Sequence, residues 1–387
     1  MNISKNLENA ALYFPDRPAV IEEDRKISYR EFNQETNRIA SALKNMGLQP
    51  GDRMALCAPG SYRWMTLYFG ALKAGATAVT LSDGLRKGEL VQVLHDAAPK
   101  ILFAAEEKLH DLGRKQDYPY LEKIVCAGGD ISYEALIEKG SPSFAAMDRN
   151  RHNTAAILYT GGTTGIPKGV MLTQENLMTS IHNIAHFEGS THRDCALCFL
   201  PLNHVFGQVH IMHSTIYSGG SLVLQPSFDL EKAIHAIGKH RVTKFYAVPT
   251  IYIRLLALDK VKQKLNSLRY CFSAAASMAA EVVREWKDRM DLDIHEAYGM
   301  TESAAMVTYN HYYHHVAGSV GTQVNTVEVQ IRDQEGHVLG PDSEGEICIS
   351  GPNIMKGYLN KPDETRSAFW DEWFRSGDIG VMDEKGY

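Results

Sequence analysis

The chain has 387 residues, with 40 lysines and arginines against 46 aspartates and glutamates, so its formal net charge is −6. A composition that is 44% hydrophobic and 22% charged excludes disordered, collagen-like and coiled-coil proteins, and this length accommodates two or three globular lobes. The chain has neither a long basic run nor an apolar run of membrane-spanning length, which predicts a cytoplasmic protein that binds no nucleic acid and has no transmembrane segment.

Short β-rich runs alternate with helical patterns over the first 320 residues. This alternation is typical of α/β proteins, in which mostly parallel sheets are flanked by helices. The expected strands are residues 53–58, 77–81, 100–104, 155–159, 196–200, 221–224, 243–248, 268–273 and 294–297.

Two helix starts carry clear capping signals. Ser28 and Glu31 form a capping box ahead of an apolar stripe that ends at Gly47. Thr173 is the expected N-cap of a helix that includes Asn176 and Leu177. Both helices begin directly after strand-like or turn-like residues, as crossover connections require.

Three regions divide the chain. Residues 1–150 form the first expected α/β lobe, and the polar stretch 139–153 connects it to a second, residues 151–318. In residues 319–387 the segments VEVQIRD and GEICISG alternate apolar with polar residues, which predicts a smaller antiparallel β lobe.

Two groups of possible metal ligands receive simpler interpretations. Cys195 and Cys198 have the spacing of a redox or zinc pair, but residues three apart on a strand face opposite sides, so we expect reduced core thiols. The cluster from His311 to His315 names no further ligand and is expected to be a solvated loop.

The segment AILYTGGTTGIPKGVMLTQEN, residues 156–176, is the most informative. Its glycines let backbone N–H groups converge on an anion, its hydroxyls add donors and Lys168 adds a positive charge, which together suit a polyphosphate. It is not a Walker motif, because Pro167 precedes Lys168 and Gly169 follows it. The candidate phosphate loop consists of Thr160, Gly161, Gly162, Thr163, Thr164 and Gly165.

Further oxygen ligands and small residues lie downstream. The hydroxyl of Thr301 and the carboxylate of Glu302 suit Mg²⁺ that bridges substrate phosphates, and Asp378 in a Gly-Asp turn suits a ribose diol. The alanines of FSAAASM, residues 272–278, leave room for a flat adenine or an acyl chain.

Together with LPLNHVFG (200–207), EAYGMTES (296–303), GEICISGPNIMKGYLNKP (345–362) and RSGDIG (375–380), these motifs resemble those of the adenylate-forming superfamily. That superfamily contains acyl- and aryl-CoA synthetases, peptide-synthetase adenylation domains and beetle luciferases. The resemblance covers nearly the whole chain, with the motifs in the expected order. Gly161 departs from it, since many relatives have serine there.

The resemblance implies a role for each motif. Residues 160–165 and Lys168 would hold the β- and γ-phosphates, Thr301 the α-phosphate and Glu302 the Mg²⁺. Catalytic roles therefore go to Thr301, Glu302 and Lys168, and the nucleotide would also contact Ala275, Ala276, Tyr298 and Asp378. The acid pocket would be formed by His204, Phe206, Gly207, Tyr246, Ala274, Met300 and Ala304.

The implied activity is ATP-dependent conversion of a carboxylic acid to an acyl-adenylate, followed by transfer to coenzyme A. The mostly apolar pocket residues favour a fatty, alicyclic or aromatic monocarboxylate. The alternatives are transfer to a carrier-protein thiol, luciferase-like oxidation and a non-catalytic nucleotide-binding module. Relatives continue into a mobile lid domain with a catalytic lysine, which this sequence does not contain, so we expect a folded N-terminal portion with strongly impaired turnover.

Overall fold

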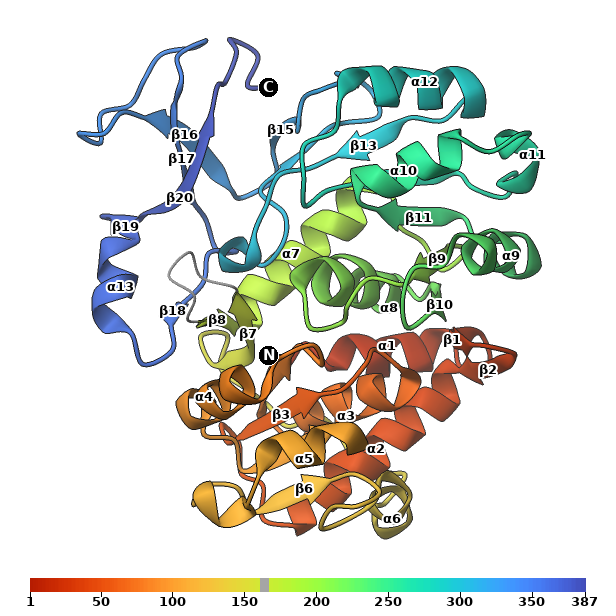
Figure 1. The fold of residues 1–387 in the computed structure, drawn as a ribbon, viewed down its shortest axis with the longest axis vertical. Coiled ribbons are helices and arrows are strands. Elements are labelled where there is room, and N and C mark those ends of the chain that lie inside the picture. The colour runs from red at the N-terminus through yellow and green to blue at the C-terminus, as the bar shows by residue number, and fades with distance from the viewer. Residues whose placement is uncertain (161–166) are drawn as a thin grey trace.

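The computed structural model describes residues 1–160 and 167–387, and it contains two seven-stranded sheets and a smaller β lobe (Figure 1). The first sheet has the order β18 (Gly357–Tyr358), β8 (Lys168–Thr173), β7 (Thr154–Thr160), β4 (Thr77–Leu81), β3 (Arg53–Cys57), β5 (Ile101–Ala104) and β6 (Lys123–Val125). The second has the order β13 (Ile294–Glu296), β12 (Tyr270–Ser273), β11 (Lys244–Ala247), β9 (Cys195–Cys198), β10 (Ser221–Leu224), β1 (Pro18–Glu22) and β2 (Arg25–Ser28).

The antiparallel lobe lies at the upper left of Figure 1, in blue. Its sheet has the order β16 (Glu328–Arg332), β17 (Gly345–Ser350), β20 (Trp373–Gly380) and β19 (Phe369–Trp370). A separate pair consists of β14 (Thr308–Tyr309) and β15 (Thr322–Gln323). The helix α13 (Pro362–Ser367) lies between β18 and β19 in the chain.

The expected fold class is confirmed. All nine predicted strands are present with ends within two residues of the prediction, and each takes part in a parallel pairing. The domain limits stay a prediction, and strands cross the expected boundary near residue 150 in both directions. The early strands β1 and β2 extend the second sheet, whereas β7, β8 and β18 extend the first.

A shared helical layer packs between the two large sheets. Its helices are α1 (Lys5–Tyr13), α2 (Tyr29–Asn45), α3 (Tyr62–Lys73), α6 (Tyr133–Lys139), α7 (Gln174–Phe187), the π-helix η3 (Phe206–His213) and α8 (Ser214–Tyr217). The capping boxes predicted at Ser28 and Thr173 are both formed. The largest hydrophobic cluster includes residues of this layer and of both sheets, so one core joins the two α/β lobes.

The outer faces of the sheets have helices of their own. The first sheet is covered by α4 (Lys87–Ala97) and α5 (Leu109–Leu112), and the second by α9 (Leu230–His240), α10 (Pro249–Leu256), α11 (Val261–Lys264) and α12 (Ala280–Met290). Short 3₁₀ turns are η1 (Glu106–Lys108), η2 (Lys115–Asp117) and η4 (Thr301–Ser303). No helix in the described ranges is long and apolar enough to cross a membrane.

The cysteines are buried free thiols, as expected. Cys195 contributes to the outer core of the second sheet, and Cys198 contributes to the core between the sheets, so the two thiols lie on opposite faces of β9. The 311–315 segment is only partly a solvated loop. His311 is buried, with its Nε2 2.7 Å from the Thr322 hydroxyl, whereas Tyr312 and Tyr313 are exposed.

A buried ammonium group ties three helices of the shared layer together. Lys73, at the end of α3, donates to Glu8 Oε1 at 3.2 Å and to the side-chain oxygens of Asn33 and Asn37 at 2.5 and 2.6 Å. Its side chain is fully buried, and this burial lowers the pKa of Lys73 to about 8 despite the nearby carboxylate. The contacts therefore compensate an ion that would otherwise be costly to bury.

Replacing Lys73 with Ala should lower the free energy of unfolding by about 3 kcal/mol, because three acceptors lose a buried donor. The matched control is Lys5→Ala, whose ion pair with Asp148 is exposed to solvent and should therefore contribute little to stability. Urea unfolding followed by circular dichroism measures both. Equal losses in the two variants would show that the buried contacts add no stability.

Candidate active site

A cavity of about 640 Å³ opens where the carboxyl ends of β7, β12 and β13 meet β20 of the small lobe. Ligands of α/β proteins commonly bind outside the carboxyl ends of parallel strands, because the connecting loops converge there. The predicted site residues that line this cavity are Thr160, Lys168, His204, Phe206, Ala274, Ala275, Tyr298, Met300, Thr301, Glu302 and Asp378. Residues from five separated sequence motifs are thus brought to one place.

Lys168 and Glu302 approach each other through a tyrosine. The Lys168 ammonium lies 5.0 Å from the centre of the Tyr358 ring, and the Tyr358 hydroxyl donates to Glu302 Oε1 at 2.9 Å. Lys168 is paired with Thr160 at the first position of β8. The predicted loop residues Gly161, Gly162, Thr163, Thr164 and Gly165 lie outside the described residues, between these two paired positions.

The turn that carries Thr301 and Glu302 is held by hydrogen bonds to its backbone from a side chain within the turn and from a distant segment. The Met300 N–H donates to Ser303 Oγ at 3.0 Å, and the Glu302 carbonyl accepts from Met355 N–H at 2.8 Å. A Cβ on Gly299 would lie 1.5 Å from the carbonyl oxygen of Ala305. Glycine is therefore required at position 299 because the chain folds back on itself and leaves no room for a Cβ. A small residue here could also suggest close approach of a ligand, but the structure gives this steric reason.

A hydrogen bond joins the second α/β lobe to the small lobe at the cavity. The Tyr298 hydroxyl, after β13, donates to Asp378 Oδ2, on β20, at 2.7 Å. Burial raises the pKa of Tyr298, so the phenol remains a donor at neutral pH. Asp378 itself is exposed and has free acceptor capacity toward the cavity.

Aromatic side chains form the wall beside the Thr301 turn. The Phe206 and Phe272 rings meet edge to face with centroids 5.7 Å apart, and His210 lies 4.2 Å from Phe272. His204 Nδ1 accepts from the Phe206 N–H at 3.2 Å, which assigns the proton of the neutral ring to Nε2. The surrounding protein lowers the pKa of His204 and favours this neutral form.

Four predicted residues do not reach the cavity surface. Tyr246 is buried behind the wall and donates to Glu188, and Ala304 is fully buried with a left-handed backbone. Gly207 packs so closely that a Cβ would lie 2.3 Å from the Pro201 carbonyl oxygen, and Ala276 faces solvent. The first three support the wall from behind and do not form its surface.

The cavity also contains residues that motif reading did not single out, above all His210, Phe272, Tyr358 and Arg375. Tyr358 and Arg375 lie inside motifs quoted above, and Phe272 begins another. The motifs therefore contained these residues, but nothing in the sequence assigned them a role in the site. Arg375 forms two contacts with Glu346 Oε2, at 2.9 and 3.2 Å, and its guanidinium lies 4.1 Å from the Trp370 ring centre. Of these four residues, only His210 lies outside every quoted motif.

A carboxylic acid is also buried beneath the cavity. Glu296, at the end of β13, is 5% exposed, and its Oε2 has no partner among the described residues. Burial raises the pKa of Glu296 to about 7, although backbone N–H groups of Gly318 and Met278 oppose the shift. This raised pKa reduces the negative charge that Glu296 adds to a site that already contains Glu302 and Asp378.

Ala275 occupies a left-handed backbone conformation, with φ of 71°, on the cavity wall. A residue with a Cβ pays about 1–2 kcal/mol for this conformation, whereas glycine does not. Ala275→Gly should therefore raise the free energy of unfolding by about 1 kcal/mol. The adjacent Ala276→Gly is the control, since it should give no gain. Denaturant unfolding that ranks the two variants equally would contradict the strain assigned to Ala275.

Comparison with known proteins agrees with this site. Residues 7–359 match the AMP-binding enzyme family. The long-chain-fatty-acid–CoA ligase of Bacillus subtilis is 29% identical over 417 residues, covering 98% of this chain and 74% of that protein. ATP-bound MatB from Rhodopseudomonas palustris has a TM-score of 0.91 at 32% identity, covering 100% of this chain and 78% of that one.

The anthranilate CoA ligase AuaEII, in complex with anthranoyl-AMP, superposes with a TM-score of 0.94 at 27% identity, over 100% of this chain and 76% of that one. The similarity therefore extends over all three lobes, including the strands that carry the cavity residues. The chain belongs to the AMP-binding enzyme family.

Proposed function

We propose that the chain activates a carboxylic acid with ATP to an acyl-adenylate and pyrophosphate, and that coenzyme A then accepts the acyl group. The observation that carries the proposal is the gathering of Lys168, Thr301, Glu302, Tyr298 and Asp378 around one cavity. The related CoA ligases, one of them solved with an acyl-adenylate, support the same reaction and the same thiol acceptor, and the ATP-bound structure of MatB supports ATP as the nucleotide.

The nucleotide would lie across the junction of the second and third lobes. Asp378 would accept hydrogen bonds from the ribose hydroxyls, while the Tyr298 ring, held by Asp378, would lie along the adenine. Ala275 has little side-chain bulk on the same wall, so a flat base could approach the backbone. Thr301 would donate to the α-phosphate from its fixed turn.

The residues present fit a divalent cation. Glu302 forms no ion pair with a described cationic side chain, and no group of three His, Cys, Asp or Glu in the described ranges could enclose a metal. One carboxylate beside a phosphate site is what Mg²⁺ uses, since it keeps waters and phosphate oxygens as other ligands. Bound there by Glu302, Mg²⁺ would neutralise phosphate charge.

The chemical step is an in-line attack of the acid carboxylate on the α-phosphate. Such a step depends on positioning and on neutralising charge, and it needs no protein nucleophile. Lys168 supplies positive charge toward the β- and γ-phosphates, and Thr301 orients the α-phosphate. The aromatic wall formed by Phe206 and Phe272 places the acid beside them and excludes water from that side.

Exchange of labelled pyrophosphate into ATP tests the proposal. A panel of monocarboxylates should include acids that support exchange, and addition of coenzyme A should then yield a thioester. Saturable ATP binding without exchange for any acid would indicate a nucleotide-binding module instead. Exchange without a coenzyme A thioester would restrict the proposal to adenylation.

Replacing Lys168 with Ala should weaken ATP binding by about 10- to 100-fold, because a charge-assisted contact to phosphate is lost. AMP binding should change little, since the ammonium is assigned to the β- and γ-phosphates. Calorimetric titration with both nucleotides measures the difference. Equal losses for ATP and AMP would place Lys168 elsewhere.

Replacing Glu302 with Gln should lower magnesium-dependent exchange by at least about tenfold, since an amide is a weaker ligand for Mg²⁺ than a carboxylate. The amide can still accept from Tyr358, so the melting temperature should stay unchanged. A magnesium titration of exchange provides the measurement. Normal activity at every magnesium concentration would remove the metal role from Glu302.

A further inference from the structure

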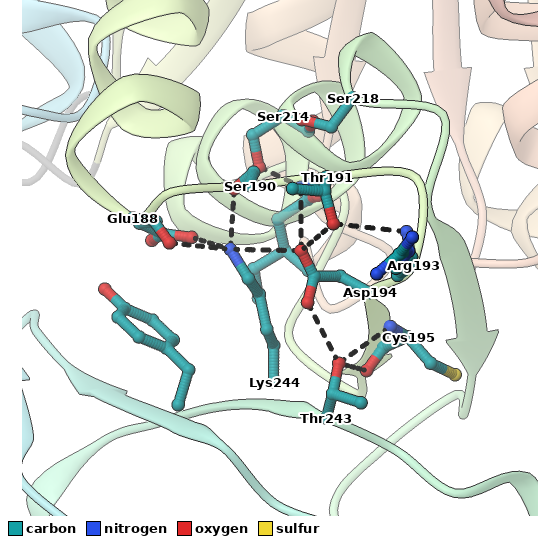
Figure 2. A network of polar contacts seen from close by, with 12 residues as sticks. Glu188, Ser190, Thr191, Arg193, Asp194, Cys195, Ser214, Ser218, Thr243 and Lys244 are labelled. Carbon is teal, nitrogen blue, oxygen red and sulfur yellow. Dashed lines mark hydrogen bonds and ion pairs between the residues drawn. The ribbon is translucent and has the colours of Figure 1, made fainter.

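A charged cluster is buried directly behind the aromatic wall of the cavity (Figure 2). Glu188, which follows the last residue of α7, has a fully buried side chain. The Lys244 ammonium lies 3.1 Å from Glu188 Oε2 and donates to Ser190 Oγ at 2.6 Å. Asp194 lies at the edge of the cluster, 4.0 Å from the same ammonium.

Two side chains of the strand β11, Lys244 and Tyr246, contact Glu188. Lys244 and Tyr246 are two residues apart and therefore share a face, while Phe245 between them packs into the outer core. The Tyr246 hydroxyl donates to Glu188 Oε2 at 2.5 Å. Burial alone would raise the pKa of Glu188, but Lys244 and the donors from His210 and Tyr246 lower it, so the carboxylate is ionised.

His210 connects this cluster to the cavity. Its Nε2 lies 2.7 Å from Glu188 Oε1, and its ring lines the cavity against Phe272. An ionised carboxylate can only accept, so Nε2 must carry a hydrogen, and in the neutral ring Nδ1 is then an acceptor. Among the described residues Nδ1 has no hydrogen-bond partner, and the ring lines the cavity.

Packing alone gives a weak reason for such a cluster. A buried ion pair usually stabilises a protein no more than well-packed apolar side chains of similar volume. Figure 2 shows Glu188, Ser190 and Asp194 grouped around the Lys244 ammonium. The arrangement does, however, fix the tautomer and orientation of His210, as a carboxylate behind an imidazole does in many functional sites.

We propose that His210 determines acid specificity by accepting, at Nδ1, a hydrogen bond from a hydroxyl or amino group at the end of the acid remote from its carboxylate. Glu188 and Lys244 are positioning residues that hold the ring. The inference rests on the proposed function and narrows its substrate to a compact acid with a distal donor. Thr301 is assigned to the carboxylate end of the acid, and the His210 ring lines the aromatic wall of the same cavity, where the other end of the acid would meet it.

Matched acid pairs test this directly in the pyrophosphate exchange assay. 4-Hydroxybenzoate and 4-aminobenzoate are each compared with 4-methylbenzoate, and 6-hydroxyhexanoate with heptanoate. The donor-bearing acid should be favoured in kcat/KM by at least about tenfold in one of the two series, because a site with an unpaired polar atom discriminates against an analogue that lacks the matching group.

His210→Phe keeps a flat ring and removes Nδ1. It should therefore abolish or invert the preference for donor-bearing acids, mainly through a change in KM. The kcat for 4-methylbenzoate should persist. His210→Gln, whose amide N–H can still reach Glu188, covers the case in which the phenylalanine variant fails to fold. The control is His213→Phe, on the same helix but buried against Tyr68, which retains a Gln208 contact. This control should keep the wild-type preference.

The outcomes separate the two proposals. Exchange with no acid at all would overturn the proposed function and this inference with it. Exchange in the wild type without any preference for donor-bearing acids overturns the inference alone, as does a preference that survives in a folded His210 variant. Loss of the preference in the His210 variants, with the His213 control unchanged, supports it.

Discussion

The packing of both seven-stranded sheets on one shared helical layer is the constraint on which the site depends. A single hydrophobic core includes residues of β3 and β4 in one sheet and of β9 to β12 in the other. Because that core fixes the two sheets relative to each other, the carboxyl end of β7 and the loops after β12 and β13 face the same cavity. Two further strands complete the cavity: β18, at the edge of the first sheet, carries Tyr358, and β20 of the small β lobe carries Asp378.

Charge inside this framework is compensated locally. Lys73 is buried with three acceptors, and Lys244 with Glu188 and Ser190, so neither ammonium is left unpaired. At the cavity the charges are compensated less completely. Lys168 lies over an aromatic ring, and Glu302 accepts only from a phenol among the described side chains. A polyphosphate with its cation would supply the missing partners for both.

The sequence predicted nine strands that form parallel pairs, two helix caps and eleven of the residues that line the cavity, because local patterns and contiguous motifs carry that information. It did not predict that β1 and β2 join the second sheet, since strand pairing over some 200 residues leaves no local signal. His210 was missed for a related reason: its partners Glu188 and Lys244 are distant in sequence and meet only in the folded chain. The predicted residues that do not reach the cavity have side-chain positions that only the folded chain reveals. Gly207 lies in the π-helix η3, Ala304 has a left-handed backbone, and Tyr246 points from β11 toward Glu188.

The central claim is that one cavity holds nucleotide and acid in a defined order. A crystal structure of the chain with a non-hydrolysable acyl-sulfamoyl adenosine, carrying a 4-hydroxybenzoyl group, tests it most directly. The account predicts the ribose on Asp378, the adenine along Tyr298, the sulfamoyl group at Thr301 and the acyl ring between Phe206 and Phe272. An analogue bound in the reverse direction, or outside this cavity, would contradict it.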